Sequence, residues 1–167
     1  MTDEVITHLD MAGPDRLRPA AEVPGVVLEP VAGSSPLIRP TQARVGAPHG
    51  WSSTAWSEEQ WRESLEGPHR YHWLVRYGAE VAGLVSMEAQ PDGNVEITTF
   101  GLVPEFVGRG IGGYALTLAV RLAWRLPGAR RVWLHTSSKD HPNALPNYRA
   151  RGFEPFHVEV KPAASSP

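Results

Sequence analysis

The 167-residue sequence contains no cysteine. That absence excludes a disulfide framework, a metal site built on thiolates and catalysis through a cysteine nucleophile. Lysine is also scarce, since it occurs only at Lys139 and Lys161, whereas arginine, proline, glycine and alanine are abundant. We attribute this bias to genome composition and draw no mechanism from it.

The sequence also lacks a long apolar run and an excess of charge of one sign. Its longest mainly apolar run, residues 114–120, is far shorter than the roughly 20 residues that a helix needs to cross a bilayer. A formal net charge of −2 gives no electrostatic basis for binding nucleic acid or an anionic membrane, so neither is expected as a partner. The acidic start, residues 1–4, does not resemble a secretory signal, and we expect a cytoplasmic protein.

The length and composition fit one globular domain. Hydrophobic residues make up 41% and charged residues 20%, which is typical of a folded chain rather than a disordered one. There is no internal repeat and no long linker. We divide the chain into an N-terminal segment, residues 1–22, with a short strand over residues 5–9, and a main domain, residues 23–167.

Apolar periodicity and turn residues predict alternating strands and helices. Ser57 and Gln60 form a capping box, which is typical of a helix start. The predicted helices are a single turn around Gln42, one from Ser57 to the Gly67-Pro68 pair, one over residues 109–126 and one over residues 143–151 capped by Asn143. The predicted strands cover residues 26–28, 71–77, 80–89, 95 to the turn at 103, 131–136 and 153–160.

Alternation along the strand that begins at Val95 decides which side chains face a ligand. Val95, Ile97 and Thr99 are expected on one face, and Glu96, Thr98 and Phe100 on the other. Because one face can pack under a helix, we expect Glu96 on the side open to a ligand.

A glycine-rich loop, Gly108-Arg109-Gly110-Ile111-Gly112-Gly113, separates this strand from the longest helix. A helix start with free N–H groups and no intervening side chains is suited to holding a phosphate. The loop lacks the lysine of a P-loop, and it lacks the spacing and the following acidic residue of a dinucleotide fingerprint. The alternative is that the glycines only let the helix pack close to the strand.

The stretch Leu102-Val103-Pro104-Glu105-Phe106-Val107-Gly108-Arg109-Gly110-Ile111-Gly112-Gly113 resembles the signature of the GNAT superfamily of acyl-CoA-dependent N-acyltransferases. That signature is Gln or Arg, two residues, Gly, one residue, then Gly or Ala, after a strand that ends at a proline corner. Val107 stands here at the Gln or Arg position. The resemblance implies that backbone amides of the loop bind the pyrophosphate of coenzyme A, with Arg109 as a substitute cation.

A second stretch, residues 141–153, resembles the late helix of the same family, written N-x-x-A-x-x-L-Y-x-x-x-G-F. Ala144, Tyr148, Gly152 and Phe153 fall in register. His141 replaces the Asn and Asn147 the Leu, while Asn143, two residues away, could provide the polar contact to pantetheine. The resemblance covers roughly residues 70–160.

The resemblance implies a single α/β (α+β) domain with a mixed, mostly antiparallel sheet flanked by helices, and acetyl-CoA as cosubstrate. It places the cofactor at Phe100, Gly101, Leu102, Val107, Gly108, Arg109, Gly110, Ile111, Gly112, Gly113, His141 and Asn143. The backbone of the strand at Gly101 would pair with pantetheine, because a glycine inside a strand suits a bulge or a close backbone approach.

Transfer of an acetyl group to an amine needs a base for the amine and an acid for the thiolate. The resemblance assigns the base to Glu96, acting directly or through a water, and the acid to Tyr148. As alternatives, Glu96 is an exposed strand residue or one paired with an arginine, and Tyr148 is a packed helix residue.

The remaining aromatic and imidazole side chains predict less. We do not expect a metal site, because His69 with His72, and His135 with Asp140 and His141, lie close in sequence without evidence that ligands converge from several elements. The tryptophans near the capping box favour core positions over an acceptor pocket: Trp51, Trp56 and Trp61.

The sequence therefore favours an N-acetyltransferase that moves an acetyl group from acetyl-CoA directly to the primary amine of a small molecule. Two alternatives stay open. The acceptor could instead be a protein N-terminus or lysine, although no strong charge run supports this, or the chain could be a non-catalytic acyl-CoA-binding or sensing domain. A homodimer is compatible with the sequence, which does not fix the oligomeric state.

Overall fold

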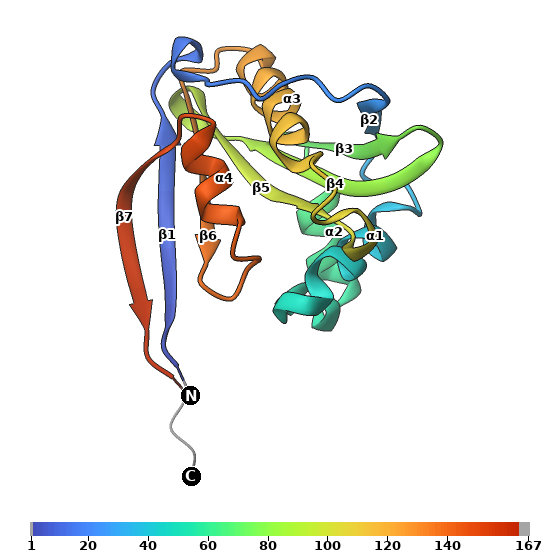
Figure 1. Cartoon of the computed structure of the whole chain (residues 1–167). Coiled ribbons are helices and arrows are strands. Elements are labelled where there is room, and N and C mark those ends of the chain that lie inside the picture. The colour runs from blue at the N-terminus through green and yellow to red at the C-terminus, as the bar shows by residue number, and fades with distance from the viewer. Residues whose placement is uncertain (1, 164–167) are drawn as a thin grey trace.

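A computed structural model describes residues 2–163, which form one seven-stranded sheet with helices on both faces (Figure 1). The strands are β1 (Glu4–Met11), β2 (Val26–Val31), β3 (Arg70–Tyr77), β4 (Glu80–Ala89), β5 (Asn94–Leu102), β6 (Arg131–Ser137) and β7 (Glu154–Lys161). The α-helices are α1 (Ile38–Gly46), α2 (Glu58–Leu65), α3 (Gly112–Arg125) and α4 (Ala144–Ala150). Among these helices none is long and apolar enough to cross a membrane.

The strand order is β2-β3-β4-β5-β6-β1-β7, and every neighbouring pair is antiparallel except β5 with β6. This confirms the predicted mixed, mostly antiparallel sheet. The parallel pairing of β5 and β6 is short: it begins at Asn94 with Arg131 and ends at Glu96 with Trp133. Beyond that point β5 stays paired with β4 and β6 with β1, but the two strands no longer pair with each other, so their far ends diverge.

The two faces of the sheet bury different apolar sets. Val75 and Val85 pack with the apolar face of α3, whereas their neighbours Leu74 and Leu84 pack with α1 and α2. Since successive residues of a strand point to opposite faces, α3 and α4 cover one side and α1 and α2 the other. The larger core lies under α3, where Ala115, Leu116, Ala119, Val120 and Ala123 are completely buried.

Strand β1 lies between β6 and β7 and pairs with both (Figure 1). The strand predicted over residues 5–9 thus lies within β1, and the segment 1–22 contributes a strand to the same sheet as the rest of the chain. From β1 the chain crosses to β2 at the opposite edge. Along the way, the N–H of Arg18 donates to the carbonyl of Arg151 (2.8 Å), and the N–H of Ala20 donates to Thr117 Oγ1 (3.0 Å).

The helix boundaries differ from the sequence expectation at two places. Helix α3 begins at Gly112 and not at residue 109, because Gly108 and Gly110 take left-handed backbone angles that a right-handed helix excludes. The single turn expected around Gln42 is in fact the nine-residue helix α1, where the apolar contacts of Ile38 and Val45 outweigh the local glycine and proline content.

Helices α2 and α4 begin where the sequence predicts a helix start. At α2 the predicted capping box is confirmed: the N–H of Gln60 donates to Ser57 Oγ (3.2 Å), and the N–H of Ser57 donates to Gln60 Oε1 (2.8 Å). At α4 Asn143 occupies the cap position, but its side chain makes no capping hydrogen bond.

Candidate acyltransferase site

The glycine-rich loop connects the end of β5 to the start of α3. After a single 3-10 turn at Pro104–Phe106, the backbone is left-handed at Gly108 (φ 78°) and Gly110 (φ 80°). No atom lies within 4 Å of the position that a β-carbon would take at either glycine. These two glycines are therefore required by the backbone conformation and leave open space beside it, so close packing does not explain them.

A cavity of about 460 Å³ lies against this loop, where β5 and β6 have diverged and α4 begins. Most of the residues expected at the cofactor site line it: Phe100, Gly101, Leu102, Val107, Gly108, Gly110, Gly112, Gly113, His141 and Asn143. At Gly101 a β-carbon would collide with the Val45 side chain of α1, so α1 packs closely against this glycine, and the expected pairing with pantetheine stays a prediction. The cavity has the size of a small-molecule site.

Two residues expected at the cofactor site do not line this cavity. The Arg109 guanidinium lies over the ring of Phe106, 4.9 Å from its centre, and 5.7 Å from the ring centre of Tyr77. Ile111 is 1% exposed and belongs to the core. Arg109 therefore packs on aromatic rings, and the side chain of Ile111 fixes the start of α3.

A second cavity, of about 520 Å³, adjoins the first on the side of β1 and β6. The two share five lining residues: His49, Trp51, Phe100, Asp140 and Tyr148. Trp56 also lines the second cavity, whereas Trp61 is a buried residue of α2, only 5% exposed. The tryptophans thus divide between the two roles considered, with Trp61 in the core and Trp51 and Trp56 at the cavities.

Tyr148 lies where the two cavities meet. The last turns of α4 hold its ring against Phe100 and Phe153, with ring centres 6.3 and 6.2 Å apart. Burial, and to a lesser extent the charge of Asp140, raise the pKa of the Tyr148 phenol well above its usual range. The phenol therefore keeps its proton at neutral pH and is available as a donor to both cavities.

A β-bulge in β5 changes the alternation expected on that strand. Ile97 pairs with Met87 and Thr99 with Ser86, so Thr98 has no partner on β4. Beyond the bulge the faces are exchanged: Thr99 shares a face with Glu96, and Phe100 turns toward Tyr148. The predicted alternation is right up to Ile97 and wrong beyond it.

Glu96 is held in a polar cluster on the sheet. Gln90 donates to Glu96 Oε1 (2.9 Å) and to Glu88 Oε1 (2.8 Å), while Arg70 pairs with Glu88 (2.7 Å). The Glu96 side chain is only 15% exposed, so it is neither a solvent-exposed residue nor the direct partner of an arginine. Burial first, and then the neighbouring Glu88, raise the pKa of the Glu96 carboxyl, whereas the Gln90 hydrogen bond lowers it.

The Glu96 carboxylate lines neither cavity, but it lies 3.8 Å from Nε2 of His135, which lines the second one. Sequence analysis did not select His135. The pattern that could have identified His135 is the alternation of β6, which places Trp133 and His135 on one face, next to Glu96.

Asp140 is a further residue that the sequence did not identify. Its carboxylate accepts from Trp51 Nε1 (3.0 Å), Thr136 Oγ1 (2.9 Å) and the N–H of Ser137 (2.9 Å). These bonds join the loop after β6 to the α1 side of the site, so Asp140 fixes the wall common to both cavities.

Of the imidazoles near α2, His72 is 3% exposed, and both of its ring nitrogens are engaged, by Ser86 Oγ (2.7 Å) and the carbonyl of Leu65 (2.9 Å). Burial lowers the pKa of His72, so it is a neutral structural residue.

Known protein families provide a comparison for this chain, in which two parallel strands diverge and a glycine loop leads into a helix. The profile of the acetyltransferase (GNAT) family matches residues 41–153, about two thirds of the chain. The chain belongs to the GNAT family. The matched range includes the glycine loop, Glu96 and Tyr148 of this GNAT protein. A comparison with curated proteins found no match.

Solved structures share the GNAT fold at low identity. A GCN5-related N-acetyltransferase from Kribbella flavida aligns over 99% of this chain with 20% identity and a TM-score of 0.65. A tandem GNAT protein from the clavulanic acid biosynthesis pathway aligns over 100% of it with 22% identity and a TM-score of 0.64. The chain spans 60% and 56% of the lengths of those two proteins. By contrast, it spans 99% of the putative acetyltransferase YycN from Bacillus subtilis, which aligns over 84% of this chain with 20% identity and a TM-score of 0.64.

Proposed function

We propose that this protein transfers the acetyl group of acetyl-CoA directly to the primary amine of a small molecule. The observation that supports this most is the meeting of two cavities at Tyr148, one against the glycine loop and one against the face of the sheet that carries Glu96 and His135. A donor in the first cavity and an acceptor in the second would bring thioester and amine together beside the phenol.

The backbone that lines the first cavity is suited to binding coenzyme A. Gly108 and Gly110 leave the loop without side chains toward the open space, and α3 begins just behind it at Gly112. Free N–H groups at a helix start favour a phosphate group, and Val107 does not need to contribute a charge for that interaction. His141 and Asn143, at the start of α4, line the same cavity and would contact the pantetheine arm.

The transfer step follows from these positions. The amine nitrogen attacks the thioester carbonyl carbon, a C–N bond forms, and the C–S bond breaks as electrons move to sulfur. Tyr148, which is protonated at neutral pH and lines both cavities, gives its proton to the departing thiolate. The proton lost by the amine nitrogen passes to His135, which faces the acceptor cavity, with Glu96 behind it stabilising the imidazolium.

The second cavity favours a small acceptor. Its volume of about 520 Å³ is in the range of small-molecule sites. Its lining combines the rings of Trp51 and Trp56 with charges of both signs, from Glu4 and Asp140 and from Lys139 and Lys161, so size and aromatic contacts rather than net charge favour a compact amine.

The test is release of free thiol from acetyl-CoA across a panel of small primary amines and lysine peptides. We expect product with at least one small amine, and loss of turnover in both Glu96→Gln and Tyr148→Phe while calorimetry shows coenzyme A binding unchanged. Tyr114→Phe, on α3 and outside both cavities, serves as a matched control. Tight coenzyme A binding without any product would favour a sensing domain, and parental turnover in both variants would refute the assigned roles.

A further inference from the structure

Three histidines form a row across the strands at one edge of the sheet. His8 of β1 is the register partner of His135 on β6 and of His157 on β7. Register partners point to the same face, and the ring centres of His8 lie 5.4 Å from His135 and 5.2 Å from His157. Such a row is not explained by the acetyl transfer, since neither His8 nor His157 lines a cavity.

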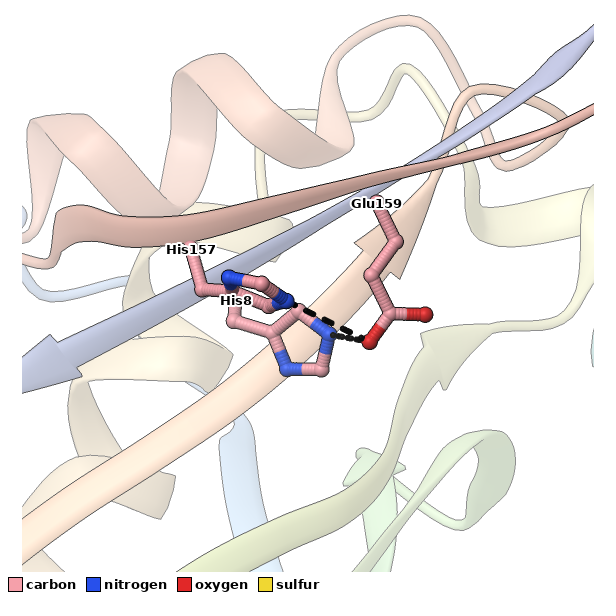
Figure 2. A group of neighbouring side chains, drawn as sticks. All are labelled: His8, His157 and Glu159. Atoms are coloured by element: carbon pink, nitrogen blue, oxygen red, sulfur yellow. Dashed lines mark hydrogen bonds and ion pairs between the residues drawn. The ribbon is translucent and has the colours of Figure 1, made fainter.

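Two of these imidazoles converge on one carboxylate oxygen (Figure 2). Nε2 of His8 is 3.2 Å and Nε2 of His157 is 3.6 Å from Oε1 of Glu159, two residues further along β7. The three atoms all lie within 4.8 Å of one another. The β-bulge between β1 and β7 at His8 and Leu9 lies next to this cluster.

We propose that His8, His157 and Glu159 bind a divalent transition-metal ion of the Zn²⁺ type. Bonds of about 2.0–2.2 Å at tetrahedral angles place neighbouring ligand atoms roughly 3.3–3.5 Å apart, and the two nitrogen-to-oxygen distances of 3.2 and 3.6 Å lie close to that value. Two imidazoles and one carboxylate leave a fourth position for water. Hard cations such as Mg²⁺ prefer sites made of oxygen alone, so this ligand set selects against them.

The side chains are free to complete this geometry. His157 and Glu159 are 56% and 47% exposed, so small rotations can bring the two nitrogens closer together, while His8, at 17%, is the fixed member. A bound ion would join ligands 151 positions apart in the chain, from the first strand and the last. Strand β7 is an edge strand with every residue exposed, so the ion attaches it to β1.

The binding test uses the full chain without a polyhistidine tag, first treated with chelator and then titrated with Zn²⁺ by calorimetry, with Mg²⁺ as the negative control. We expect one equivalent of Zn²⁺ to bind, with affinity at least tenfold weaker in His157→Ala and in Glu159→Gln. His69→Ala removes an exposed histidine outside the cluster and should bind as the parent does. No binding of Zn²⁺, or parental affinity in both cluster variants, overturns the proposal.

Two further measurements separate an ordered site from adventitious binding. Co²⁺ in a tetrahedral nitrogen and oxygen site absorbs visible light, and we expect such bands in the parent and none in His157→Ala. Hydrogen exchange should show slower exchange of β7 amides on addition of Zn²⁺ in the parent only. If the ion binds but β7 exchange is unchanged, its role in attaching β7 is refuted.

Discussion

At the scale of single residues, the candidate site contains two buried groups, Tyr148 and Glu96, whose pKa values are both raised above their ordinary values. Tyr148 is 7% exposed, and the aromatic ring of Phe100 lies beside it. Gln90 donates to both Glu96 and Glu88, and the Glu96 carboxylate lies 3.8 Å from His135. In both cases burial is the first cause of the raised pKa, because desolvation disfavours the charged form of each group.

Replacing Tyr148 by Phe should lower kcat by about 10²-fold or more, because general acid catalysis commonly contributes a factor of this size. The affinity for coenzyme A should stay within a factor of two or so, because the hydroxyl is the only group removed. Thiol release under saturating acetyl-CoA, together with calorimetry, measures both quantities. An unchanged kcat would show that the thiolate leaves without this proton.

The raised pKa of the Tyr148 phenol also predicts the alkaline side of the pH profile. Since the phenol stays protonated well above the ordinary tyrosine range, the rate should not fall between neutral pH and the usual tyrosine pKa of about 10. Rates over that interval with the parent test this directly. A decline in that range would mean that the acid titrates normally.

Glu96→Gln should separate stability from activity. A carboxyl whose folded pKa is raised binds its proton more tightly in the folded state, so ionisation of Glu96 destabilises the fold once the pH exceeds the unfolded value. The variant should therefore have a higher Tm than the parent at pH 7–8, and this difference should shrink as the pH falls below the folded pKa. The groups facing Glu96 are Glu88, Arg70, His135 and His8, which are left intact.

Thermal melts at several pH values measure this effect, and thiol release measures the accompanying loss of turnover. A Tm difference that is the same at acidic and neutral pH would show that Glu96 does not titrate with a raised pKa.

At the scale of elements, the loop that leads into α3 depends on glycine at two positions. Gly108 and Gly110 both have left-handed backbone and open surroundings, so an added methyl group costs strain rather than a collision. The same conformation occurs at Gly128 (φ 73°), after α3 and outside both cavities.

Gly108→Ala and Gly110→Ala should each weaken coenzyme A binding by roughly tenfold, because strain of about 1 kcal/mol displaces the loop and the methyl group points into the space of the ligand. Gly128→Ala carries the same backbone strain and should cost similar stability without affecting coenzyme A. Calorimetry and thermal melts on the three variants compare the two effects. If Gly128→Ala weakens binding equally, the effect of the loop variants is on folding alone.

At the scale of the whole molecule, the first strand of the chain lies beside the last. Strand β1 pairs with β7 on one side and with β6 on the other. Its residues Leu9 and Met11 are 0% and 1% exposed, so β1 is part of the main core. This arrangement also places His8 beside His135 on one side and His157 on the other.

Leu9→Ala should lower the free energy of unfolding by about 2–5 kcal/mol, as is usual when a fully buried leucine is truncated. Val27→Ala, on β2 at the opposite edge and 55% exposed, should change it by no more than about 0.5 kcal/mol. Denaturant unfolding of the two variants measures both values. A small effect at Leu9 would mean that the segment 1–22 is not needed by the core.

The sequence alone determined most of the local elements and the glycine loop that lines the first cavity. The capping box at Ser57, the glycines at 108 and 110 and the register of Tyr148 are written in contiguous residues, because helix caps, left-handed turns and helix faces depend on neighbours a few positions apart. Tertiary structure alone decided the position of β1, the divergence of β5 from β6, the bulge at Thr98 and the approach of His135 to Glu96. These depend on which strands pair and in which register, and contacts between segments far apart in the sequence set that; His8 and Glu159, for example, are 151 positions apart.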